Sequence, residues 1–178
     1  MPQVTLGLFE EIGHGRGFTE VATVTPPAAN TSFVYKLDGR YWERPSSLAF
    51  SLTTDANAAN RTVSVTFANG NGLVIARHVS PSVQTAGLTW NYTLLPNQST
   101  YNTVVGLNVS MPLWHGFMRE EGTLTIAVAS SQAGDQIKNI AYDRARFITG
   151  PGGYLQGDVE DIENARLLAA LKAALLAA

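Results

Sequence analysis

An antiparallel two-sheet β-sandwich of jelly-roll type, followed by one C-terminal α-helix, is the fold that the sequence predicts. Apolar residues alternate with small or polar ones in eight or nine short runs between residues 18 and 149, as in strands with one face in a core. Turn residues separate the runs and no helical pattern intervenes, which favours hairpins and Greek-key connections. After residue 157 the apolar spacing becomes that of a helix.

The central stretch, residues 47–79, is predicted to form three strands of one antiparallel sheet. The alternating apolar residues form three sets: Leu48, Phe50 and Leu52; Val63, Val65 and Phe67; and Leu73, Ile75 and Val79. Asn69-Gly70-Asn71-Gly72 tolerates positive φ and predicts a tight hairpin between the second and third strands. Each set is expected to face the core.

The remaining strands are predicted on both sides of this stretch. Residues 18–24 lie before Pro26-Pro27, and residues 33–37 lie before the turn dipeptide Asp38-Gly39. Further alternating sets are Leu88, Trp90, Tyr92 and Leu94; Val105, Leu107, Val109 and Met111; and Leu124, Ile126 and Val128. Residues 136–149 form the last predicted strand. Because Trp90 and Tyr92 share the parity of Leu88 and Leu94, we expect them in the core.

The sequence divides into four predicted segments. An N-terminal arm covers residues 1–17, the β-sandwich domain covers 18–149, a Gly-rich linker covers 150–157, and an amphipathic helix covers 158–178. The arm contains a Gly-x-Gly-x-Gly spacing at residues 13–17, but it lacks the Lys-Ser/Thr of a phosphate-binding loop. We therefore expect an arm or turn there.

The predicted helix begins at the capping residue Asp158, and acidic residues follow in its first turns. Its apolar stripe consists of Leu167, Leu168, Leu171, Leu175 and Leu176. A helix this short needs a packing partner, so we predict that the stripe is a subunit or partner interface. The spacing leaves open whether it packs on its own sheet or on a neighbour. The run 167–178 is too short to span a membrane and contains Lys172.

Composition argues against several classes of partner. The chain has 178 residues, a formal net charge of −2, 15% charged residues and no cysteine. Without a basic cluster, nucleic acid is not expected as a partner, and no disulfide or thiolate site is possible. The N-terminus lacks a signal-peptide pattern, so we expect synthesis in a cytoplasm. The Asn-x-Ser/Thr patterns at residues 30, 60, 91, 97 and 108 are then expected to remain unmodified.

No catalytic residues, cofactor or metal site are predicted. His14, His78 and His115 lie far apart in the sequence and lack the spacing of metal ligands. The acidic residues near 158–163 are explained by the start of the helix, and the pattern of a calcium loop is absent. As an alternative function, Tyr41, Trp42 and Trp114 are candidates for an aromatic platform that binds a host-surface glycan.

Several blocks of strand and turn residues stand out within residues 35–148. They are Tyr35-Lys36-Leu37-Asp38-Gly39-Arg40-Tyr41-Trp42-Glu43-Arg44-Pro45, Ala49-Phe50-Ser51-Leu52-Thr53-Thr54-Asp55, Ala59-Asn60-Arg61-Thr62-Val63 and Ala133-Gly134-Asp135-Gln136-Ile137. These blocks resemble a group of small structural proteins of tailed bacteriophages. The Ala/Leu-rich tail is not a feature that we associate with that group.

The resemblance implies a virion protein with a β-sandwich, placed on the capsid as a decoration or minor capsid protein. It implies no enzyme activity and no cofactor, and the major capsid protein or other virion proteins as partners. We further expect a homo-oligomer, with a trimer favoured. A neck or tail attachment protein of the same virion and the glycan-binding module remain alternatives.

Overall fold

The computed structural model describes residues 17–39, 41–96, 98, 107–118 and 121–148. Within these ranges it contains nine strands: β1 Gly17–Thr23, β2 Phe33–Lys36, β3 Tyr41–Thr53, β4 Thr62–Ala68, β5 Val74–Val79, β6 Thr89–Leu95, β7 Asn108–Pro112, β8 Thr123–Ala129 and β9 Gln136–Ile148. The predicted arm before residue 17, the linker and the helix at 158–178, with its leucine stripe, lie outside the described residues.

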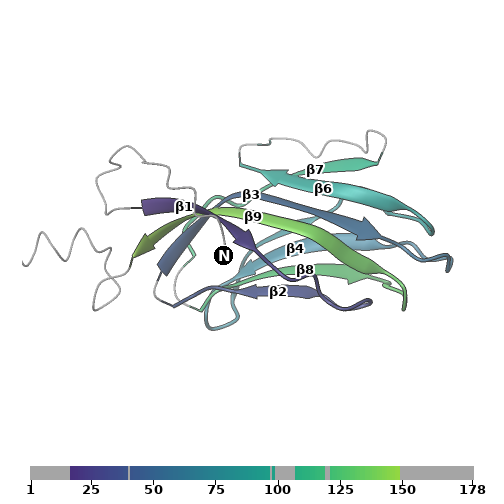
Figure 1. Cartoon of the computed structure of the whole chain (residues 1–178), viewed down its shortest axis with the longest axis horizontal. Helices are drawn as coiled ribbons and strands as arrows, with labels where there is room; N and C mark the ends of the chain where they lie inside the picture. Colours follow the sequence, from purple (N-terminus) through teal and green to yellow (C-terminus); the bar gives the residue numbers. More distant parts are fainter. Residues whose placement is uncertain (1–16, 40, 97, 99–106, 119–120, 149–178) are drawn as a thin grey trace, which may run out of the picture.

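The strands form two sheets that pack face to face (Figure 1). One sheet has five strands in the order β1-β9-β3-β6-β7, and the other has four in the order β2-β8-β4-β5. The pairs β1·β9, β2·β8, β3·β6 and β4·β5 are nested, which is the winding of a jelly roll. All pairs are antiparallel except β6·β7, which is parallel. The predicted all-β sandwich is therefore confirmed.

The prediction that residues 47–79 form one sheet is wrong. β3 belongs to the five-stranded sheet, whereas β4 and β5 belong to the other, and the connection 54–61 crosses between them. Alternation shows which side chains face a core, but the two sheets of a sandwich bury their side chains in the same core. The pattern consequently did not show which sheet each strand joins.

The prediction that the third apolar set faces the core is also wrong. Leu73 is 68% exposed, and Ile75 and Val79 are 41% and 40% exposed. The β4·β5 register shifts between Phe67 and Ala68, so Ile75 is an extra residue on β5. The core-facing positions of β5 are therefore Ala76 and His78. As the edge strand of its sheet, β5 leaves most of its apolar side chains accessible.

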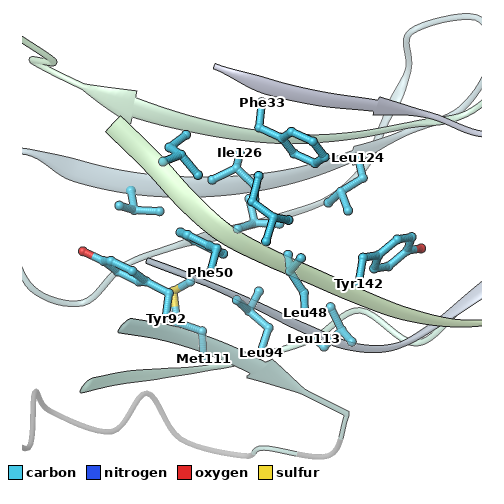
Figure 2. Close-up of a cluster of buried hydrophobic side chains, with 14 of the residues drawn as sticks. Phe33, Leu48, Phe50, Tyr92, Leu94, Met111, Leu113, Leu124, Ile126 and Tyr142 are labelled. Carbon is cyan, nitrogen blue, oxygen red and sulfur yellow. The ribbon is translucent and has the colours of Figure 1, made fainter. Parts of the chain in front are cut away.

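The core lies between the two sheets, as Figure 2 shows for one cluster of its side chains. The apolar sets predicted for β3, β4, β6 and β8 are buried; only Leu88 and Val128 are partly so. The aromatic rings of Phe50 and Tyr92 stack at 5.0 Å across β3 and β6. In the predicted strand that became β7, Val109 and Met111 are buried, whereas Leu107 precedes the strand and is exposed.

The predicted hairpin between β4 and β5 is confirmed. The Gly72 amide donates to the Asn69 carbonyl at 2.9 Å, and the Asn69 side chain accepts the amides of Asn71 and Leu73. Gly72 has a φ of 78°, a left-handed conformation that side chains disfavour. Glycine is therefore required there for backbone conformation.

We predict that Gly72→Ala lowers the free energy of unfolding by about 1 kcal/mol, the cost of a left-handed alanine. A Cβ at Gly72 would meet no atom within 4 Å, so the loss reports conformation alone. Gly39→Ala is the matched control, because Gly39 also has open space but no positive φ. Urea unfolding of both variants measures the difference. Equal stabilities of the two would contradict the conformational explanation.

Candidate functional site

Arg61 is fully buried and uses every N–H donor of its guanidinium group. Its Nε donates to Asp135 Oδ2 at 2.8 Å, and its Nη2 donates to Asp135 Oδ1 at 3.0 Å and to Asp55 Oδ1 at 2.6 Å. Its Nη1 donates to the carbonyl oxygens of Asn57 and Ala59 at 2.8 and 2.9 Å. We call Arg61, Asp55 and Asp135 the Arg61 cluster.

The Arg61 cluster lies where the chain crosses between the two sheets. Asp55 and Arg61 belong to the β3–β4 connection, and Asp135 belongs to the β8–β9 connection. The Asp135 carbonyl accepts the amide of Asn30 from the β1–β2 connection at 2.7 Å, and the Asp55 carbonyl accepts the amide of Gly87 from the β5–β6 connection at 2.7 Å. The cluster thus joins the connections at one end of the sandwich.

Both carboxylates of the Arg61 cluster are held in the ionised form. Burial acts to raise the pKa of Asp135, but hydrogen bonds from Arg61 and from backbone amides outweigh it, so this pKa is lowered. The pKa of Asp55 is lowered in the same way, mainly by the amides that it accepts. Carboxylates fixed as anions are weak proton donors and acceptors at neutral pH. We therefore interpret the cluster as structural.

A second set of charged and tyrosine side chains lies between the sheets near the start of β3. We call it the Glu43 cluster, and its members are Glu20, Tyr35, Glu43, Tyr142, Arg144 and Arg146. Glu43 Oε1 accepts hydrogen bonds from Arg146 Nε at 2.9 Å and from the Tyr35 hydroxyl at 3.2 Å. Glu43 Oε2 lies 3.3 Å from Arg144 Nε as an ion pair whose alignment is too poor for a hydrogen bond.

The other contacts of the Glu43 cluster balance its charges. Glu20 lies 2.7 Å from Arg146 Nη1 and 3.3 Å from Arg144 Nη2. The Arg144 guanidinium also lies over the ring of Tyr35, 4.9 Å from its centroid. Glu43 has no exposed side-chain surface. Two arginines therefore face two glutamates inside the sandwich, within the described residues.

The Glu43 carboxyl is the described side chain that most resembles a catalytic acid. Burial raises its pKa, and attraction to Arg144 and Arg146 offsets only part of that effect. A raised carboxyl pKa is common in active sites, but it is also produced by buried ion pairs. Because no part of this side chain reaches the surface, we interpret the Glu43 cluster as structural as well.

The histidines are not brought together as metal ligands. His78 packs edge-on to Phe67 at 6.3 Å, its Nε2 is buried, and burial lowers its pKa. His115 Nδ1 lies 2.9 Å from the Pro45 carbonyl oxygen, and His14 lies outside the described residues. The described ranges contain no group of three metal-ligating side chains. They also contain no helix with the length and apolar character needed to cross a membrane.

The structure does not place the predicted sugar-binding aromatics on one surface. Tyr41 and Trp42 are consecutive in β3 and so face opposite sides of the sheet. The Tyr41 ring lies 4.8 Å from the guanidinium of Arg146, whereas Trp42 contacts Phe117. Trp114 packs against a core phenylalanine of β4 at 5.6 Å. A coplanar platform of these three residues is absent from the described structure, and glycan binding itself stays an untested prediction.

The outer face of the four-stranded sheet carries small, uncharged side chains at its centre, on β4 and β8. The residues that point away from the core include Val34 and Lys36 on β2, Thr62, Ser64, Thr66 and Ala68 on β4, Arg77 and Val79 on β5, and Thr123, Thr125, Ala127 and Ala129 on β8. We call this surface the Thr/Ala face. Its centre, on β4 and β8, holds no charge, and its two rims include Val34, 58% exposed, and Val79.

The β5 edge of the Thr/Ala face is open within the described structure. β5 pairs with β4 on one side and is the last strand of its sheet. Exposed edges are commonly protected by short length, proline or charge. β2, at the opposite edge, has four residues and carries Lys36 near Glu121, 3.9 Å away. β5 has six residues, no proline, and Arg77 as its one permanently charged residue.

The comparisons with known proteins yield little. No family model and no curated protein matches the chain. Among solved structures, it is similar to a chain from the work titled "Crystal structure of the T13 IBDV viral particle reveals a missing link in icosahedral viruses evolution". The identity is 10%, the TM-score is 0.36, and the match covers 88% of this chain but 37% of the viral one. A likeness at this level does not assign a function.

Proposed function

We propose that this chain is a non-enzymatic structural protein of a tailed-phage virion, which binds the capsid shell as a decoration or minor capsid protein. The observation that carries the proposal is the Thr/Ala face with its open β5 edge. The resemblance of the strand and turn blocks to small structural proteins of tailed phages supports the same role. The two charged clusters support the non-enzymatic part of the proposal, because their charged groups form hydrogen bonds with one another inside the sandwich.

The chemistry of the Thr/Ala face suits attachment to another protein. Charged residues are depleted at the centres of protein interfaces because their desolvation is costly, and the centre of this face has none. Short threonine and alanine side chains also allow a second backbone to approach closely. The edge amides and carbonyls of β5, which no described strand pairs with, can receive an extended segment of the partner as an added strand. The proposed partner is the major capsid protein.

Thr125→Lys on β8 tests this attachment, because it places a charge at the centre of the Thr/Ala face. We expect at least a tenfold weaker binding to capsid shells that were assembled without this protein, since the lysine must be desolvated. Co-sedimentation over a concentration series measures the affinity.

Thr93→Lys is the matched control for that test. Thr93 lies on β6 of the five-stranded sheet, and β6 has a neighbouring strand on each side, as β8 does. Its side chain points to the outer face of that sheet, away from the Thr/Ala face. Its lysine variant should bind the shell as the unmodified chain does. Equal losses in both variants, or no loss in either, would contradict attachment through the Thr/Ala face. Thermal unfolding of both variants verifies that each sandwich is intact.

A further inference from the structure

An aromatic patch lies on the outer face of the five-stranded sheet, on the side opposite to the Thr/Ala face. It consists of Trp42 on β3, Phe147 on β9, Phe117 from the β7–β8 connection, and Arg44 on β3. Trp42 and Phe147 are register partners. The Phe117 ring lies 6.1 Å from that of Trp42 and 5.3 Å from that of Phe147, both edge-on.

The backbone next to Phe117 explains why this ring is directed outward. Met118 forms an isolated bridge with Glu43 of β3, with N···O distances of 2.7 and 3.0 Å. Met118 is fully buried, so its neighbour Phe117 takes the opposite direction and remains 43% exposed. A large exposed aromatic ring held by a buried neighbour is a fixed apolar surface.

The patch also contains a cation without an ionic partner in the described structure. The Arg44 guanidinium lies 5.6 Å from the centroid of the Phe117 ring, and its buried Nε makes no hydrogen bond with the described residues. A segment that covers this patch is therefore expected to supply leucine-like side chains for the rings and a carboxylate for Arg44.

Residues 158–178 of the same chain have both properties. The segment opens with Asp158, Glu160, Asp161 and Glu163 and continues with the leucine stripe at residues 167–176. The last described residue of β9 is Ile148, which directly follows Phe147 of the patch. Residues 149–157 can span up to about 30 Å at about 3.3 Å per residue. The segment is therefore tethered beside the patch, at an effective concentration on the order of millimolar.

We propose that residues 158–178 dock on the aromatic patch of their own chain, with the leucine stripe on Phe117 and its neighbouring rings and with an acidic residue of the segment at Arg44. The tethering favours the chain's own patch over that of a second copy. This docking does not depend on the virion role. It covers the aromatic patch on the five-stranded sheet and leaves the Thr/Ala face available to a partner.

Hydrogen exchange of the full chain, followed by mass spectrometry, tests the docking. Amides in residues 165–176 should exchange at least tenfold more slowly than in an unstructured peptide. Phe117→Asp should remove that protection. Val21→Asp should preserve it, because Val21 is also exposed on the outward face of this sheet but lies outside the patch. Unprotected amides in the unmodified chain, or protection that survives Phe117→Asp, would overturn the proposal.

Leu171→Asp provides a second test that changes no residue of the described sandwich. We expect the amides of residues 115–118 to exchange several-fold faster in this variant, since the cover over Phe117 is lost. Unchanged exchange there would overturn the docking. Light scattering, which measures the mass in solution, distinguishes docking on the chain's own patch from docking on that of a second copy. If the chain is a monomer and the protection persists on dilution, the segment occupies the patch of its own chain. Protection that disappears on dilution together with a fall in mass would instead assign the patch of a second copy.

Discussion

Arg61→Met is expected to lower the free energy of unfolding by about 3–5 kcal/mol, the usual cost of removing one partner of a buried ion pair. The methionine fills part of the volume, but Asp135 then remains buried with its side chain 1% exposed and without its cation. The carbonyls of Asn57 and Ala59 lose their donor as well. Urea unfolding, monitored by tryptophan fluorescence, measures the loss.

The pH dependence of this loss distinguishes an ionic effect from simple packing. The folded-state pKa of Asp135 is lowered, so its contribution to stability is present above the unfolded pKa of about 3.9 and is lost as the pH falls through the folded value. The difference between the unmodified chain and Arg61→Met should therefore shrink below about pH 4. A difference that stays constant over this range would contradict the ionic explanation.

The strands could be predicted from sequence because their apolar alternation is a local property. Val63, Val65 and Phe67 alternate, and all three are buried. Sheet membership could not be predicted in this way, since it depends on pairings such as Leu52 with Ile137 that join distant segments. The β5 residues show a further limit: the bulge at Ile75 changes which side chains face the core, and nothing in the local spacing marks it.

The charged clusters were missed by sequence reasoning, although Arg61, Asp55 and Asp135 all lie in the strand and turn blocks singled out in the sequence. The sequence pattern shows Arg61 and Asp135 only as turn residues. Their contact joins positions 74 residues apart, and local spacing cannot indicate such a contact. The signal in the sequence was Arg61 itself, a charged residue directly before the uncharged run of β4. The Thr/Ala face was visible in part, as the small residues that alternate with the apolar set of β4. Its lack of charge indicates a continuous uncharged surface only when β4 and β8 are known to be neighbouring strands.

Removal of the Glu43 carboxylate is the second substitution with a large expected effect. Glu43→Leu leaves the buried Arg144 and the partly buried Arg146 with Glu20 as their remaining carboxylate in the cluster, and we expect a loss of about 3–5 kcal/mol. Lys36→Met is the control, because the Lys36–Glu121 pair is exposed and its removal should change stability by less than about 1 kcal/mol. Calorimetric unfolding compares the two variants.

A double substitution tests whether the loss arises from uncompensated arginines rather than from packing. Glu43→Leu combined with Arg144→Leu removes a charge of each sign, so the double variant should be less destabilised than the sum of the two single variants. The pH dependence of stability that Glu43 produces should also be opposite in direction to the one that Asp135 produces in the Arg61 cluster. Because burial raises the pKa of Glu43, ionisation of this carboxyl costs the folded state free energy, so the free energy of unfolding of the unmodified chain should fall as the pH rises from the unfolded pKa through the folded value. Additive losses would mean that Glu43 and Arg144 act independently, which their 3.3 Å separation argues against.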